Sequence, residues 1–226
     1  MSVTEALFRP LLAGDRSRPL ITHYDDAAGT RVELSVATLA NWAAKTANWL
    51  SEEFDVEPGT PVMVDLPAHW QTAGVLLGAW WCGAHITASA PEVALTTVDG
   101  VPPSGAAWAV VSLDPMGMGL RGSPPDGAVD YISESRMFGD DFFPSQDVPG
   151  STPALGTLTV AEVVASAREK AVTGRVLSTL EWTVPDGVVS GLLSVLAGGG
   201  SLVQVSNPST ADAHLESERA TPITAS

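Results

Sequence analysis

The sequence is poor in cysteine and in lysine, and each shortage excludes a class of structure or partner. Cys82 stands alone, so no disulfide can form within the chain. Lysine occurs twice among 11 basic residues, which face 26 acidic ones and leave a formal net charge of −15. So acidic a surface repels phosphate backbones and anionic lipid headgroups. We therefore expect neither nucleic acid nor an anionic membrane surface as a partner.

Long uninterrupted apolar runs are also missing. The N-terminal residues carry Glu5 and no apolar stretch of the length that a secretory signal needs. Residues 66–91 and 187–211 lack formal charges, but histidine, proline, glutamine and clustered glycines interrupt them. A buried helix followed by a buried strand explains both stretches without a membrane span. We predict a cytoplasmic protein, and its richness in alanine, glycine, valine and proline is typical of a high-GC bacterial genome.

What the sequence does contain is an alternation of helix and strand patterns. Ser35 is a favoured N-cap residue, and apolar residues recur at helical spacing from there to Phe54, which predicts a helix. A Pro-Gly turn follows it. The next predicted elements are a strand over 62–66, a helix over 69–81, and strands over 84–88 and 108–113. This order predicts an α/β fold with mainly parallel sheets flanked by helices.

Residues 114–157 break the alternation, because they are rich in glycine, proline, aspartate and serine. We expect mostly loop there, with one short helix near 132–138. Regular patterns then resume as a helix over 160–171, a strand over 176–180, a helix over 188–197, a strand over 202–205 and a helix over 210–219. We predict a single domain over residues 1–226, with an irregular region at 114–157.

Residues 31–88 carry an ordered set of short motifs. A turn precedes the first predicted strand, a Leu-Pro pair follows that strand, and a Gly-Ala pair ends the next predicted helix. The residues of these motifs are Val56, Pro58, Gly59, Val62, Leu66, Pro67, Gly83 and Ala84. The stretch resembles the opening of the adenylate-forming enzymes, which include acyl-CoA synthetases, luciferases and non-ribosomal peptide adenylation domains. Thr60 stands where that family usually has aspartate. The resemblance covers the N-terminal part of the family's large domain and implies its fold.

Residues 175–205 resemble a second stretch of the same family, the segment just after its phosphate loop. The family reads Pro-x-x-His-x-x-Gly there, and Glu181, Val184 and Gly187 take these three positions. The histidine or aromatic position borders the acyl pocket in the family. The resemblance therefore implies a pocket at Val184 and Gly187, more apolar than in the enzymes because valine cannot form a hydrogen bond.

Between these stretches, the phosphate loop of the family is degenerate. The family reads Thr-Ser-Gly-Ser-Thr-Gly-x-Pro-Lys-Gly, and its amides, hydroxyls and lysine hold the phosphates of ATP. The nearest match is Gly150, Ser151 and Thr152, followed by Pro153, which has no amide hydrogen to donate. No lysine follows, and the family's downstream half with its catalytic lysine has no counterpart. We predict no catalytic residue and no required cofactor, with any ATP or AMP binding confined to this remnant.

The other chemistry-bearing residues form no recognisable motif. Gly117–Gly122 fits G-x-G-x-x-G, but prolines follow it in place of the helix that a dinucleotide site needs. Asp25 and Asp26 lack the spacing of a calcium loop and are interpreted as turn residues. The four histidines are scattered, without cysteine or carboxylate partners at ligand spacing, so we predict no metal site. They are His23, His69, His85 and His214.

Three hypotheses follow. The first is a non-catalytic, adenylate-forming-enzyme-like protein that acts as a binding or interaction module, with a protein partner. The alternative is a subunit that retains nucleotide or acyl-adenylate binding and is completed by a partner, in the manner of an AMP-dependent acid ligase. A dinucleotide-binding protein ranks last. The first hypothesis predicts that the isolated chain does not catalyse ATP–pyrophosphate exchange.

Overall fold

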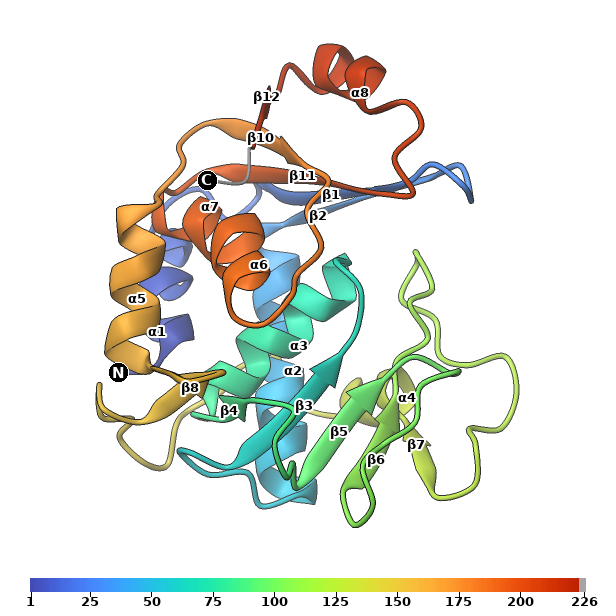
Figure 1. Ribbon diagram of the computed structural model, residues 1–226, viewed down its shortest axis with the longest axis vertical. Helices are drawn as coiled ribbons and strands as arrows, with labels where there is room; N and C mark the ends of the chain where they lie inside the picture. Colours follow the sequence, from blue (N-terminus) through green and yellow to red (C-terminus); the bar gives the residue numbers. More distant parts are fainter. Residues whose placement is uncertain (224–226) are drawn as a thin grey trace.

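The computed structural model describes residues 1–223 as two β-sheets with helices between and around them (Figure 1). In the orientation of Figure 1 a five-stranded sheet lies above a seven-stranded sheet, and we call them the upper sheet and the lower sheet. Most neighbouring strands run parallel, with one antiparallel pair in each sheet. The predicted α/β fold with mainly parallel sheets is confirmed.

The upper sheet consists of β1 (Pro19–Asp25), β2 (Thr30–Ser35), β10 (Arg175–Ser178), β11 (Ser201–Ser206) and β12 (Thr221–Pro222). Its strand order is β12-β10-β11-β1-β2. β1 pairs antiparallel with β2 and parallel with β11, so that His23 lies opposite Gln204. Sequence analysis located β10 and β11 but missed β1 and β2. Isoleucine, threonine and tyrosine in β1 are favourable strand residues that would have supported its assignment.

The lower sheet consists of β3 (Pro61–Asp65), β4 (His85–Ile86), β5 (Val93–Thr96), β6 (Ala107–Val110), β7 (Ala128–Asp130), β8 (Pro153–Leu155) and β9 (Leu158–Thr159). Its strand order is β7-β6-β5-β3-β4-β8-β9. The strands predicted at 62–66, 84–88 and 108–113 correspond to β3, β4 and β6. Each is shorter at its C-terminal end than expected, because the chain turns there into the loops that join sheet to helix.

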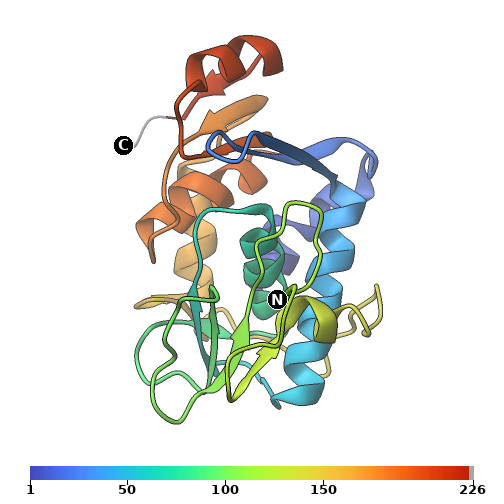
Figure 2. The same ribbon diagram turned by 90° about the vertical axis from the view of Figure 1, so that its right-hand side faces the viewer.

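Two helices form the centre of the molecule, α2 (Val36–Glu53) and α3 (Trp70–Trp81). Both were predicted, with Ser35 and His69 as the observed N-caps. α2 runs from the upper sheet down to the lower one (Figure 2). α3 is buried along its whole length and contacts strands of both sheets. The helices cross closely at Gly78, where an added Cβ would lie 2.4 Å from the Cβ of Thr46.

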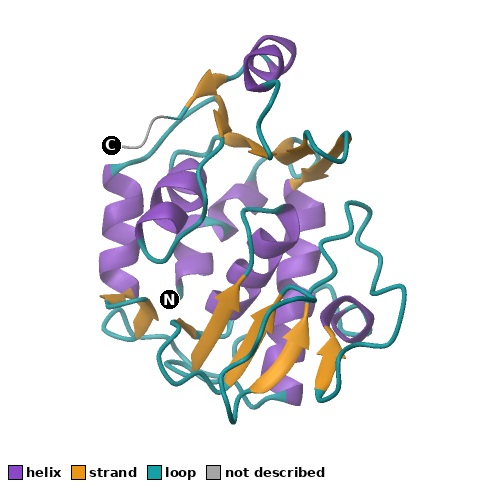
Figure 3. Cartoon of the chain, turned by 45° about the vertical axis from the view of Figure 1, so that its right-hand side comes forward, coloured by secondary structure: helices purple, strands orange, loops and turns teal. Residues whose placement is uncertain are grey.

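The remaining helical segments are α1 (Val3–Leu7), η1 (Arg9–Ala13), α4 (Tyr131–Ser135), α5 (Val160–Glu169), α6 (Asp186–Val188), η2 (Val189–Leu193), α7 (Ser194–Ala197) and α8 (Ala211–Glu218). The helix predicted over 188–197 is interrupted, because η2 is a turn of π-helix. Most helices fill the space between the sheets, whereas α8 stands alone outside the upper sheet (Figure 3).

A cluster of charged and polar side chains connects α8 to the outer face of the upper sheet. Glu218 accepts hydrogen bonds from the hydroxyl of Tyr24 and from the guanidinium groups of Arg31 and Arg175. Burial would raise the pKa of Glu218, but these hydrogen bonds outweigh it and lower the pKa to about 2. The carboxylate therefore stays ionised and holds the C-terminal helix in place across a wide pH range.

The region predicted as irregular, 114–157, contains more structure than expected. It includes β7, α4 and β8, and the short helix expected near 132–138 is observed as α4, beginning at Tyr131. Lys45 of α2 reaches into this region, donating to the carbonyl of Phe138 at 2.7 Å. Across residues 1–223, no helix combines the length and apolar character needed to cross a bilayer.

Candidate functional site

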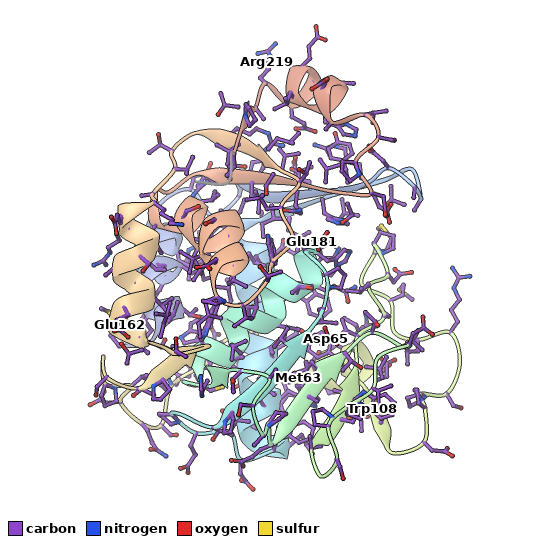
Figure 4. The ribbon with its side chains drawn as sticks, in the orientation of Figure 1. Met63, Asp65, Trp108, Glu162, Glu181 and Arg219 are labelled. Carbon is purple, nitrogen blue, oxygen red and sulfur yellow. The ribbon has the colours of Figure 1, made fainter. Side chains whose placement is uncertain are left out.

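A cleft opens between the two sheets, at the carboxyl ends of strands from both. It has a volume of about 450 Å³. In open parallel sheets this is the edge at which ligands bind, because the loops there are free to vary. Glu181, which lines the cleft, lies between the upper and lower sheets in Figure 4. The lining residues are His23, Asp25, Ala28, Thr30, Pro67, His69, Ser112, Leu113, Asp114, Pro115, Glu181, Ser206 and Asn207.

Two histidines meet at the inner end of this cleft. His23 comes from β1 and His69 caps α3, and their ring centroids are 4.3 Å apart in an edge-on arrangement. Burial lowers the pKa of His23 to about 4. Burial, and then the neighbouring His23, lower the pKa of His69 to about 3. Both rings are therefore neutral at physiological pH. The interpretation of the histidines as scattered is wrong for this pair, because the fold brings β1 and the start of α3 together.

Hydrogen bonding fixes which ring nitrogens carry protons. Nδ1 of His69 accepts from the amide of Gln71 at 3.1 Å, so its proton sits on Nε2. The hydroxyl of Ser206 donates to the carbonyl of Ala68 at 3.3 Å and has no second proton. We assign the proton of His23 to Nε2, because His23 then donates across the 3.0 Å contact to Ser206 while the Ser206 hydroxyl keeps its bond to Ala68.

Nδ1 of His23 is consequently an acceptor with a free lone pair. It is buried, and no group within residues 1–223 donates to it. His23 as a whole is only 3% exposed. A buried acceptor without a donor costs roughly 1–3 kcal/mol, so such groups call for an explanation.

The charges that line the cleft are all negative. Asp25, Asp114 and Glu181 contribute carboxylates, and neither lysine nor arginine lines it. Burial would raise the pKa of Asp25, but hydrogen bonds from the Asn207 side chain and from two backbone amides outweigh it and lower the pKa. The cleft is therefore unfavourable for phosphate and carboxylate ligands.

Helix α3 holds the lower wall of the cleft in place. The Gln71 side chain donates to the carbonyl of Asp114 at 2.8 Å, and the indole of Trp70 donates to the carbonyl of Pro115 at 3.2 Å. Oδ1 of Asp114 accepts from the amides of Met116 and Met118. The loop after β6 is thus fixed at its base, even though the side chains of Met116 and Met118 are exposed.

The resemblance implies a phosphate loop, and the structure has a closed hairpin where the chain enters α5. β8 and β9 are joined by Gly156 and Thr157 alone. The amides of Val160 and Ala161, in the first turn of α5, already donate to the carbonyls of Thr152 and Gly150, each at 2.9 Å. A helix start offers phosphate its free amides, and these are occupied.

A carboxylate reinforces this closure. Glu162 and Thr159 form a reciprocal capping box at the start of α5, in which Glu162 accepts from the amide and hydroxyl of Thr159. Its negative charge lies where a phosphate would need positive charge. Figure 4 shows Glu162 at the lower end of α5, far along the molecule from Glu181 and the cleft.

The predicted remnant of Gly150, Ser151 and Thr152 lies in the turn before β8. Gly150 and Ser151 are exposed, and the carbonyls of Gly150 and Thr152 face the α5 amides. Toward the start of α5, the remnant therefore presents carbonyl oxygens that already accept hydrogen bonds. ATP or AMP binding by these residues stays a prediction.

Of the predicted pocket residues, Val184 lies in the loop between β10 and α6, and Gly187 lies within α6. Val184 is 42% exposed and touches the hairpin turn, since a Cβ on Gly156 would lie 3.4 Å from it. A Cβ on Gly187 would lie 2.3 Å from the carbonyl of Glu181, so only glycine fits that bend. Neither residue lines the cleft between the sheets. Their role in a pocket stays a prediction.

Within residues 1–223, no group of three or more histidine, cysteine, aspartate or glutamate side chains is placed to hold a metal ion. Cys82 is buried, and burial raises the pKa of its thiol to about 12. It is therefore inert as a nucleophile at neutral pH.

The fold is that of the N-terminal part of an adenylate-forming enzyme. An acyl-CoA synthetase from Brucella canis superposes on 97% of this chain with a TM-score of 0.76 at 14% identity. The chain spans 46% of the length of that synthetase. At such low identity the likeness defines the fold and leaves activity open.

The sequence itself has a nearer relative. A TIGR03089 family protein from Mycobacterium tuberculosis is 44% identical over 227 residues, which cover 93% of this chain and 92% of the relative. The chain belongs to the TIGR03089 family. No protein-family model matches it.

Proposed function

We propose that this chain is a non-catalytic, adenylate-forming-enzyme-like binding protein, whose ligand site is the cleft between the sheets. The observation that carries the proposal is the closed start of α5. Its first amides are bonded to Gly150 and Thr152, and the Glu162 carboxylate occupies its N-terminus. With no lysine at the hairpin, ATP phosphates have no groups there to hold them.

The cleft supports the binding part of the proposal. It is built from loops of both sheets, has a volume of about 450 Å³ and contains an acceptor to which no group of residues 1–223 donates. Clefts of this size are typical of small-molecule sites. A cytoplasmic location and a protein partner belong to the same proposal, because the acidic surface favours neither nucleic acid nor anionic membranes.

The test is ATP–pyrophosphate exchange with a panel of carboxylic acids, together with calorimetric titration of ATP and AMP. We expect no exchange above a heat-denatured sample and no heat of nucleotide binding. An acyl-CoA synthetase assayed in parallel supplies the positive control. Exchange by the isolated chain, or micromolar ATP binding, would overturn the proposal.

The alternative is a subunit that keeps acyl-adenylate binding and is completed by a partner. It is favoured by the match to only 46% of a solved synthetase. A non-hydrolysable acyl-adenylate mimic discriminates between the two. Saturable binding of the mimic, lost in a variant with Val184→Trp, supports the alternative, because Val184 stands at the acyl position of the family.

A further inference from the structure

We propose that the cleft binds an organic ammonium ion, a primary or secondary amine with an apolar body, whose N–H group donates to Nδ1 of His23. The inference rests on the proposed role of the cleft as a ligand site and names the chemical class of the ligand. Three properties of the cleft define that class, namely a lone-pair acceptor at its inner end, carboxylates around it, and apolar surface beside them.

The acceptor sets the first requirement. Nδ1 of His23 has a lone pair, is buried, and receives no hydrogen bond from residues 1–223. A ligand that brings an N–H group supplies the donor that this acceptor lacks, whereas a ligand without one leaves it unpaired. A quaternary ammonium ion has none, which restricts the ligand to amines that retain an N–H group.

The charges set the second requirement. Three carboxylates line the cleft without a single lysine or arginine, and the two histidines are uncharged at neutral pH. Oδ1 of Asp25 is held by the Ala27 and Ala28 amides and by Asn207, and Oδ1 of Asp114 by two further amides. Both carboxylates are thus oriented before a ligand arrives, and for neither does a hydrogen bond within residues 1–223 involve Oδ2.

The size and the walls set the third requirement. A volume of about 450 Å³ is far larger than a metal ion needs, and the described residues contain no metal-binding group. Pro67, Leu113 and Pro115 supply apolar wall, and Met116, whose side chain is exposed, follows Pro115 in the chain. An alkyl or aryl body on the amine would cover this surface and remove it from water.

The experiment compares three probes of matched shape by calorimetry at neutral pH. They are 2-phenylethylammonium, its N,N,N-trimethyl derivative, and 3-phenylpropionate. We expect saturable binding of the first, about tenfold or more weaker binding of the second because it lacks an N–H donor, and none of the third. No binding of 2-phenylethylammonium at millimolar concentration, or equal binding of all three, would overturn the inference.

Two variants locate the binding. Asp114→Asn keeps an oxygen for the Met116 and Met118 amides but removes the charge, and Glu181→Gln changes an exposed side chain that forms no hydrogen bond within residues 1–223. Each should weaken 2-phenylethylammonium binding by about tenfold. Asp126→Asn, an exposed carboxylate outside the cleft, should leave it unchanged. Equal effects of all three variants would reduce the binding to non-specific attraction by an acidic protein.

The nucleotide titrations keep this inference separate from the proposed function. Failure of amine binding together with absent ATP binding overturns the ligand class and leaves the non-catalytic proposal standing. ATP binding or exchange overturns the non-catalytic proposal whatever the amine does.

Discussion

The two ends of α3 lead to regions of opposite character. At its N-terminal end, His69 meets His23 in a cleft with a buried acceptor that receives no hydrogen bond from the described residues, 1–223. Beside its C-terminal end, Trp80 donates to the carbonyl of Ala154 at 2.9 Å, within a hairpin where amides and carbonyls are paired. Because both regions belong to the same fold, the fold by itself does not determine whether a site is open or closed. The unpaired group at one end, and the paired groups at the other, distinguish an open site from a closed one.

The largest expected effect comes from breaking the scaffold that both regions share. In Gly78→Ala, the new Cβ would meet Thr46 at 2.4 Å and the carbonyl of Ala43 at 2.7 Å. Because one of these atoms is backbone, we expect a loss of about 3 kcal/mol in the free energy of unfolding. Urea titration measures it, and Gly122→Ala is the matched control, since nothing lies within 4 Å of that position. Wild-type stability in Gly78→Ala would show that the helices can separate at little cost.

The second effect belongs to the cleft alone and depends on pH. The pKa of His23 in the folded protein is about 4, below its ordinary value of 6.5, so the unfolded chain binds the proton more readily. Burial of the neutral His23 ring therefore contributes fully to the free energy of unfolding above about pH 6.5, and this contribution is lost as the pH falls toward 4. His69 acts in the same direction, with a pKa of about 3.

Urea unfolding at a series of pH values measures this dependence. Between about pH 6.5 and 5, the free energy of unfolding of the wild type should fall by roughly 2 kcal/mol more than that of His23→Phe. Glu218, whose pKa is lowered to about 2, loses its own contribution only below its ordinary value of 4.5, outside that window. An unchanged slope in His23→Phe would mean that the ring is more hydrated than its burial indicates.

The third effect belongs to the hairpin region alone. Thr159→Ala removes the capping box of α5, and we expect a loss of about 1 kcal/mol in the free energy of unfolding. ATP binding should remain absent, because the first amides of α5 stay bonded to carbonyls. Ser151→Ala is the control, an exposed residue of the predicted remnant that should change neither quantity. Nucleotide binding that disappears in Ser151→Ala would establish the remnant as a site.

The smallest expected effect tests whether the cleft is separate from the pocket that the family resemblance implies. Val184→Trp changes a residue that is 42% exposed and does not line the cleft. We expect the affinity for 2-phenylethylammonium to stay as in the wild type, because Val184 is not one of the residues that line the cleft. Calorimetric titration of the variant checks this. Loss of amine binding would move the ligand site to Val184 and Gly187.

The parts of the fold that sequence analysis located are those with a strong local pattern. α2 has an N-cap and apolar residues at helical spacing, and α3 is apolar on every face because both sheets cover it. β1 was missed even though its residues favour a strand and β2, its antiparallel neighbour, follows it directly. Its parallel neighbour is β11, at the other end of the chain. No local signal reports such a partner.

The cleft escaped sequence analysis for the same reason. His23, His69, Asp114 and Glu181 come from four separate loops or strand ends, and no spacing relates them. His69 was placed correctly at the start of a helix, but its contact with His23 depends on the pairing of β1 with β11. The closed hairpin was not predicted either, because residues 114–157 were expected to be mostly loop.

The pairing of β1 with β11 also has a consequence for how the protein is made. The β1–β2 hairpin leaves the ribosome early, whereas β11 begins only at Ser201. Until β11 emerges, β1 presents a bare strand edge, the kind of surface that pairs with other chains. Closing such a long loop is slow compared with forming α2 and α3. Nascent chains that stall before Ser201 should therefore be the ones that aggregate and occupy chaperones.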